Sequence, residues 1–106
     1  MKHAFNHENL DCYKLSLEVA RWVYRARYPR GCQSLRDQLV RASQSVVLNI
    51  AEGCGRGGQA EKNHFRIALG SAGECCAALD LVPVAGSEQQ QANLRRIGAM
   101  LRRLSG

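Results

Sequence analysis

The sequence predicts an all-α fold, an antiparallel up-down-up-down four-helix bundle. Apolar residues recur at helical spacing, and no segment alternates in the way of a half-buried strand. Two prolines, Pro29 and Pro83, and a glycine cluster at 53–58 divide the chain into four segments. The connections between these segments are short, which makes neighbouring helices antiparallel.

The chain length and the position of the breaks place the four helices. A chain of 106 residues suits one domain with a modest core, so we expect a single domain over 1–106. The expected helices are about 8–28, 32–53, 59–82 and 88–104.

The residues between these segments indicate how each helix ends. Pro29 and Gly31 close the first helix, and Gly53 is placed to end the second in the left-handed conformation. Pro83 stops the third helix, and Ser87 with Gln90 has the spacing of a capping box for the fourth.

The first helix has two apolar faces. One consists of Leu10, Tyr13, Leu17, Ala20 and Tyr24, and the other of Leu15, Val19, Trp22 and Ala26. A lone bundle buries only one face of an outer helix, so the second face predicts contact with another copy of the chain. The alternative is that Trp22 wraps the edge of its own bundle.

The second and third helices carry apolar stripes with polar residues beside them. The expected core positions are Leu35, Leu39, Ala42, Val46, Ile50 and Gly53 on one helix, and Phe65, Ala68, Ala72, Cys75, Leu79 and Val82 on the other. Next to them lies a polar seam, consisting of Gln38, Arg41, Ser45, Asn49, Glu52, Gly53, Ser71 and Glu74. Partly desolvated polar groups must find hydrogen-bond partners, so the seam predicts a network between the two helices.

Two details of this pairing are expected. Arg41 is within reach of Glu74 or Glu52 for a charge-assisted pair. Gly70 and Gly73 each cost about 1 kcal/mol relative to alanine inside a helix, which predicts a close approach of another backbone.

The residue pattern does not favour an enzyme. The serines have no histidine in register, so no catalytic residues are expected. The glycine run at 53–58 lacks the preceding strand and the Gly-Lys-Ser/Thr end of a phosphate-binding loop, and no cofactor is expected. Arg56 and the free amides after it are the one candidate anion contact in this turn.

The five cysteines are an odd number and include no Cys-x-x-Cys pair. They are expected to be reduced thiols in a cytoplasmic protein. Cys75 and Cys76 with the three histidines lack the spacing of known zinc modules, so no metal site is expected. Apolar runs are too short to span a membrane.

The net charge of +6 suits a polyanionic partner. One expected cluster joins the end of the first helix to the start of the second, and consists of Arg21, Arg25, Arg27, Arg30 and Arg36. The other lies on the fourth helix, and consists of Arg95, Arg96, Arg102 and Arg103. The alternative is that these cations only complement helix dipoles.

Several short motifs together resemble one family. They are Gln38-Leu39-Val40-Arg41-Ala42, Ser45, Asn49-Ile50-Ala51-Glu52-Gly53, Arg56, Phe65, Ala68, Gly70-Ser71 and Glu74, with Leu10, Tyr13, Leu17, Trp22 and Pro29 before them. This combination is similar to the bacterial proteins named for reading frames in intervening sequences of 23S ribosomal RNA. Cys54 and Cys75 depart from the usual pattern of that family.

The resemblance implies a homopentamer of four-helix bundles around a central channel. It also implies a relation to the accessory variability protein of diversity-generating retroelements, which binds nucleic acid and associates with a reverse transcriptase. It supplies no catalytic residues. We therefore expect an oligomeric, non-enzymatic protein that binds RNA or DNA, possible partners being a reverse transcriptase or another protein. The alternative is an interaction scaffold that docks an acidic protein.

Overall fold

The computed structural model describes residues 3–106, so residues 1–2 of the expected domain lie outside the described part of the chain. It contains a short 3₁₀ helix, η1 (Asn6–Asn9), followed by four α-helices. These are α1 (Asp11–Arg25), α2 (Gln33–Arg56), α3 (Gly58–Leu81) and α4 (Ser87–Ser105). Residues 3–106 contain no strand, and the prediction of an all-α fold with four helices is confirmed.

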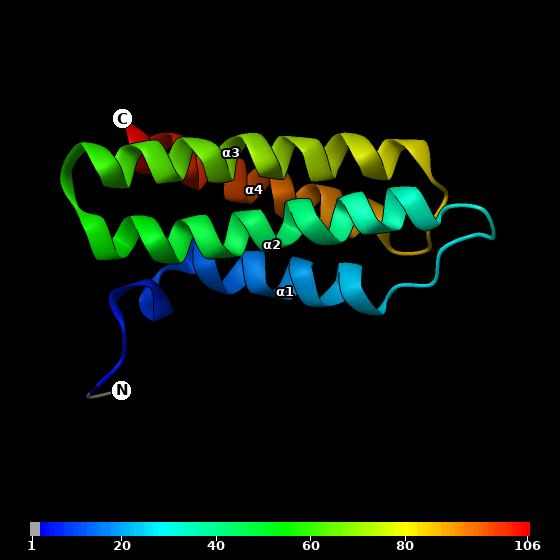
Figure 1. Ribbon diagram of the computed structural model, residues 1–106, viewed down its shortest axis with the longest axis horizontal. Coiled ribbons are helices and arrows are strands. Elements are labelled where there is room, and N and C mark those ends of the chain that lie inside the picture. Colours follow the sequence, from blue (N-terminus) through cyan, green and yellow to red (C-terminus); the bar gives the residue numbers. More distant parts are fainter. Residues whose placement is uncertain (1–2) are drawn as a thin grey trace.

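The helices run alternately up and down, as the short connections predicted (Figure 1). The two longest, α2 and α3, lie side by side as a hairpin, with α4 behind α3 and α1 beside α2. The first helix also packs against α4, which closes the bundle. The chain measures 43 × 28 × 21 Å along its principal axes.

The core runs between all four helices. Its largest fully buried side chains are Phe65, Leu39, Ile50, Ile97, Leu101, Val19, Val23 and Val46. All six core positions predicted on the third helix are buried. On the second helix every predicted core position is buried except Leu35, which is partly exposed. Burial of apolar surface at about 25 cal/mol per Å² is the main source of stability in such a bundle.

The prediction of two separate apolar faces on the first helix is wrong. The buried residues of this helix are Cys12, Ser16, Val19 and Val23, a stripe that falls between the two predicted faces. Val19 is 1% exposed, so it belongs to the core and cannot form part of a contact surface between subunits. Leu15 and Trp22 are partly buried against the core, so this side of α1 is largely covered within one chain.

The ends of the helices differ from the predictions at two places. Gly53 does not end α2, which continues to Arg56, and the left-handed glycines are Gly57 and Gly58 with φ of 70° and 59°. Ser87 is not the N-cap of α4: Gly86 takes that position with φ of 91°, and the Ser87 hydroxyl donates to the Val84 carbonyl.

Glycines fit the packing differently from the prediction. A Cβ on Gly53 would lie 2.9 Å from Cε1 of Phe65 and 3.2 Å from the carbonyl oxygen of Glu61, so this glycine allows α2 and α3 to approach closely. At Gly70 and Gly73 no atom would lie within 4 Å of an added Cβ, and both residues are exposed. The close approach predicted at Gly70 and Gly73 is therefore wrong within one chain.

The packing predicts opposite effects for two glycine-to-alanine substitutions. Overpacking costs about 1–3 kcal/mol, and alanine recovers about 1 kcal/mol of helix propensity, so Gly53→Ala is expected to lower the free energy of unfolding by up to about 2 kcal/mol. The matched control Gly70→Ala meets no atom and is expected to raise it by up to about 1 kcal/mol. Urea unfolding of both variants checks this, and a stabilised Gly53→Ala would contradict the packing at Phe65.

Candidate nucleic-acid interface

The polar seam is a hydrogen-bond network that joins α2 to α3. The hydroxyls of Ser45 and Ser71 lie 2.8 Å apart. The Asn49 amide donates to the carbonyl oxygen of Ser45 at 2.9 Å and to its hydroxyl at 3.1 Å. The side-chain oxygen of Asn49 lies 2.9 Å from Nδ1 of His64. These contacts satisfy groups that are partly removed from water, which is a structural role.

His64 is a member of this network that the sequence analysis missed. Because the Asn49 amide nitrogen donates to Ser45, its oxygen is free to accept, and Nδ1 of His64 is the donor. The sequence spacing could have indicated this, since His64 lies two helical turns before Ser71 and therefore on the same face of α3.

The charged ends of the seam are exposed and only partly follow the prediction. Gln38 donates to a carboxylate oxygen of Glu74 over 3.5 Å, and Arg56 pairs with Glu52 at 2.8 Å. Arg41 is exposed and forms no ion pair with either glutamate, so the predicted Arg41 pair is wrong. The Arg56–Glu52 pair also reduces the charge that Arg56 offers to an anion at the turn.

Four arginines on α4 are charges without a salt-bridge partner among the described residues. Arg95, Arg96, Arg102 and Arg103 are all exposed. Among residues 3–106 the salt bridges are Arg36–Asp37 and Arg56–Glu52, so none involves α4. The helix has one acidic residue, Glu88 in its first turn.

Two more cations lie on α3 where it faces α4. Arg66 donates to the backbone carbonyl of Ser105 at 3.4 Å, and the ammonium of Lys62 approaches Gly106. Between these helices Arg95 and Arg102 line a groove of about 290 Å³ with a floor that includes Gly73 and Gly98. The α3–α4 side is therefore basic over much of its length.

The predicted cluster at the other end of the bundle is present in part. Arg36 stacks over the ring of Tyr24 with 5.6 Å between guanidinium carbon and ring centroid, and donates to the Tyr24 carbonyl at 3.3 Å. The end of α1 therefore meets the start of α2, as predicted. Arg21 and Arg25 line a groove between α1 and α4, while Arg27 and Arg30 are exposed on the connecting loop.

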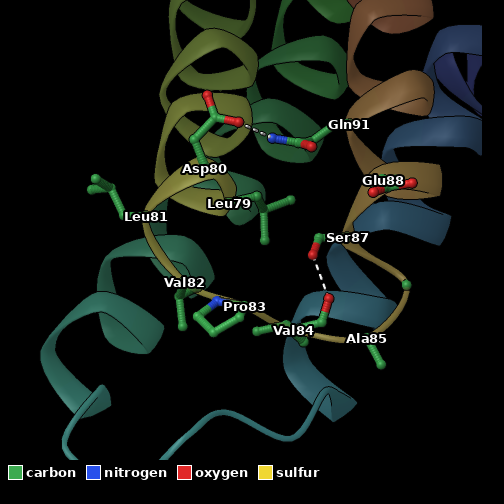
Figure 2. Close-up of a pocket in the computed structure, with 11 residues that line it drawn as sticks. Leu79, Asp80, Leu81, Val82, Pro83, Val84, Ala85, Ser87, Glu88 and Gln91 are labelled. Atoms are coloured by element: carbon green, nitrogen blue, oxygen red, sulfur yellow. Dashed lines mark hydrogen bonds between the residues drawn. The ribbon is translucent and has the colours of Figure 1, made fainter.

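A hollow of about 690 Å³ is lined by the loop between α3 and α4 and by the adjoining ends of these helices (Figure 2). Its charged lining residues are Asp80 and Glu88, both acidic. The Gln91 amide donates to Asp80 at 2.8 Å and to the Cys76 carbonyl at 3.0 Å, so its donors already have partners. This hollow does not suit an anionic ligand.

The thiols are arranged for packing. Cys75 is fully buried, and burial raises its pKa to about 12. Burial also raises the pKa of Cys12 and of Cys54. A protonated thiol is a poor nucleophile and a poor metal ligand at neutral pH. Across residues 3–106 no three His, Cys, Asp or Glu side chains gather in a way that would hold a metal ion.

Comparison with known proteins identifies one family. A family model described as "23S rRNA-intervening sequence protein" matches residues 8–103. No curated protein matches the chain significantly. In the described part of the chain, none of the helices has the length and apolar character needed to cross a membrane.

The network predicts that Asn49 contributes more to stability than its exposed neighbours in the seam. Asn49→Ala leaves the His64 donor without its acceptor and removes the two hydrogen bonds to Ser45, and is expected to cost about 1–3 kcal/mol of unfolding free energy. The control Arg41→Ala removes an exposed side chain and is expected to change it by less than about 0.5 kcal/mol. Thermal and urea unfolding measure both, and a larger loss in the Arg41 variant would refute the structural role of the network.

Proposed function

We propose that this chain, which belongs to the 23S rRNA-intervening sequence protein family, is a non-enzymatic oligomer that binds nucleic acid as an accessory factor. The partner in this proposal is RNA or DNA, held mainly through its phosphates. Neither a catalytic step nor a cofactor is part of it.

The observation that carries the proposal is the charge of α4. Four exposed arginines and one glutamate lie on this helix, and none of the arginines is engaged in a salt bridge within residues 3–106. Arginine binds phosphate with two parallel hydrogen bonds, and neutralised phosphates release counterions, which supplies affinity without sequence specificity. Lys62 and Arg66 on α3 extend the same basic side.

Exposed apolar side chains on α2 and α3 support self-association. Leu48 on α2 is 64% exposed and Ile67 on α3 is 51% exposed, and Gly70 leaves open space beside Ile67. Exposed apolar side chains of this size favour a protein contact. We therefore place the subunit contact of a homopentamer on the outer faces of α2 and α3, which leaves the basic side free. The sequence predicted this contact on α1 instead. Val19 lies in the core, and a contact through Leu15, Trp22 and Ala26 is the alternative to the placement on α2 and α3.

Neutralising α4 tests the nucleic-acid role. With Arg95, Arg96, Arg102 and Arg103 all changed to Gln, RNA and DNA affinity is expected to fall, and the dependence of log K on log salt to flatten by about 0.7–0.9 for each lost phosphate contact. Fluorescence anisotropy with labelled oligonucleotides at several salt concentrations measures both quantities. Folding is checked by circular dichroism.

Two outcomes would contradict the nucleic-acid role. One is the absence of binding by the intact protein at low salt. The other is an unchanged salt dependence in the α4 variant. Capture of one stoichiometric, nuclease-resistant acidic protein by the same arginines would instead favour the scaffold alternative.

The molar mass of the protein in solution tests self-association. Light scattering after size-exclusion chromatography is expected to show a multiple of the 11.7 kDa chain at micromolar concentration. Ile67→Glu is expected to lower that mass, because a charge at an apolar contact is left without a partner. The control Gln89→Glu adds the same charge at an exposed position on α4, away from the outer faces of α2 and α3, and should leave the assembly intact. A monomeric wild type would overturn the oligomer.

A further inference from the structure

The first feature of the groove between α1 and α4 is its basic lining. The groove has a volume of about 550 Å³ and is lined by Lys14, Glu18, Arg21, Trp22, Arg25, Ala26 and Gln90. Its cations lie on one stripe of α1, at steps of seven and four residues. Three positive charges stand against the one negative charge of Glu18.

The second feature is a partly exposed aromatic wall. Trp22 is packed against the core on one side, and the indole edge with Nε1 faces Gly86, where an added Cβ would lie 3.2 Å from Nε1. Gly86 has φ of 91°, a conformation that favours glycine, so the loop is able to come this close. The indole is therefore held in a fixed place beside Arg21 and Arg25.

The third feature is an amide with a free donor. Gln90 is 8% exposed, and its side-chain oxygen accepts from the Asn93 amide at 3.4 Å. The side-chain nitrogen of Gln90 has no acceptor among the described residues. Every fully buried side-chain nitrogen or oxygen of these residues has a hydrogen-bond partner, so the Gln90 nitrogen is not fully buried and is accessible from the groove. A nearly buried donor at the wall of a basic groove is suited to a ligand that brings an acceptor.

These features together fit one kind of ligand. The groove between α3 and α4 has cations but no aromatic residue, and the hollow at the α3–α4 loop is acidic. Proteins that bind single strands combine a basic groove with aromatic side chains on which bases stack. The faces of paired bases inside a duplex are already stacked, so an aromatic wall of this kind selects an unpaired base.

We propose that the α1–α4 groove binds single-stranded nucleic acid. One base stacks on Trp22 and accepts a hydrogen bond from Gln90, and Lys14, Arg21 and Arg25 contact the phosphates on either side. Glu18 accepts from an amino group of a base. This inference rests on the proposed function and adds to it a site and a preference for single strands.

The fluorescence of Trp22 tests the site directly, because it is the single tryptophan of the chain. The full chain is titrated with a single-stranded oligonucleotide of about 16 nucleotides, near the upper site size of a single-strand-binding module, and with its duplex. The single strand is expected to quench the Trp22 emission and to bind about tenfold or more tightly than the duplex. The duplex is expected to leave the emission nearly unchanged.

A matched pair of variants tests the donor. Gln90→Met keeps the side-chain length and removes the amide, and is expected to weaken single-strand binding about three- to tenfold, the value of one hydrogen bond. Gln89→Met makes the same change at the adjacent exposed position and should leave binding unchanged. Anisotropy of a labelled oligonucleotide measures both, and duplex binding should be equal for the two variants.

The outcomes separate this inference from the proposed function. Binding of oligonucleotides with unchanged Trp22 emission and equal affinity for single strand and duplex would overturn the groove site and leave the proposed function standing. Equal effects of the two glutamine substitutions would also overturn it. No binding of any oligonucleotide would overturn both, and quenching by an acidic protein alone would assign the groove to a protein partner.

Discussion

The close approach of α2 and α3 is the contact on which the rest of the structure depends. Gly53 gives Phe65 space to pack against the α2 backbone, and the hydroxyls of Ser45 and Ser71 meet across the same interface. These two helices have 24 residues each and are joined by Gly57 alone. The hairpin they form provides the surface on which α1 and α4 complete the core.

This packing separates structural polar groups from available ones. Serine, asparagine and histidine side chains in the α2–α3 interface are used in hydrogen bonds to each other. Such groups have little left to offer a ligand, whereas the arginines of α4 keep their donors exposed to solvent. The polar residues of the seam therefore hold the fold together, and the proposed nucleic-acid contacts use other residues, on α4.

The sequence predicts most of the fold because helical periodicity places large apolar residues correctly. The core positions of α2 and α3 follow from it. On α1 the core includes Ser16, whose Oγ donates to the Tyr13 carbonyl, and a serine does not count as apolar in a periodic pattern. Without Ser16 in the pattern, the periodicity groups Val19 with Leu15 and Trp22 on an outer face.

Gly53 and Gln90 show why some helix ends and groove residues could not be predicted from the sequence. A glycine can end a helix or admit a neighbouring side chain, and at Gly53 only the position of Phe65 distinguishes the two. Gln90 fits the spacing of a capping box, and its place at the wall of a groove depends on how α1 and α4 pack. Tertiary contacts decide such positions, and local patterns do not contain them.

The division between a structural α2–α3 interface and a binding side at α4 can be measured residue by residue. Amide chemical-shift changes are recorded by NMR while the protein is titrated with a single-stranded oligonucleotide. The account predicts changes along α4 and the adjoining sides of α1 and α3, with the amides of Ser45, Asn49 and Ser71 unaffected. Changes centred on those three residues, with α4 unaffected, would contradict it.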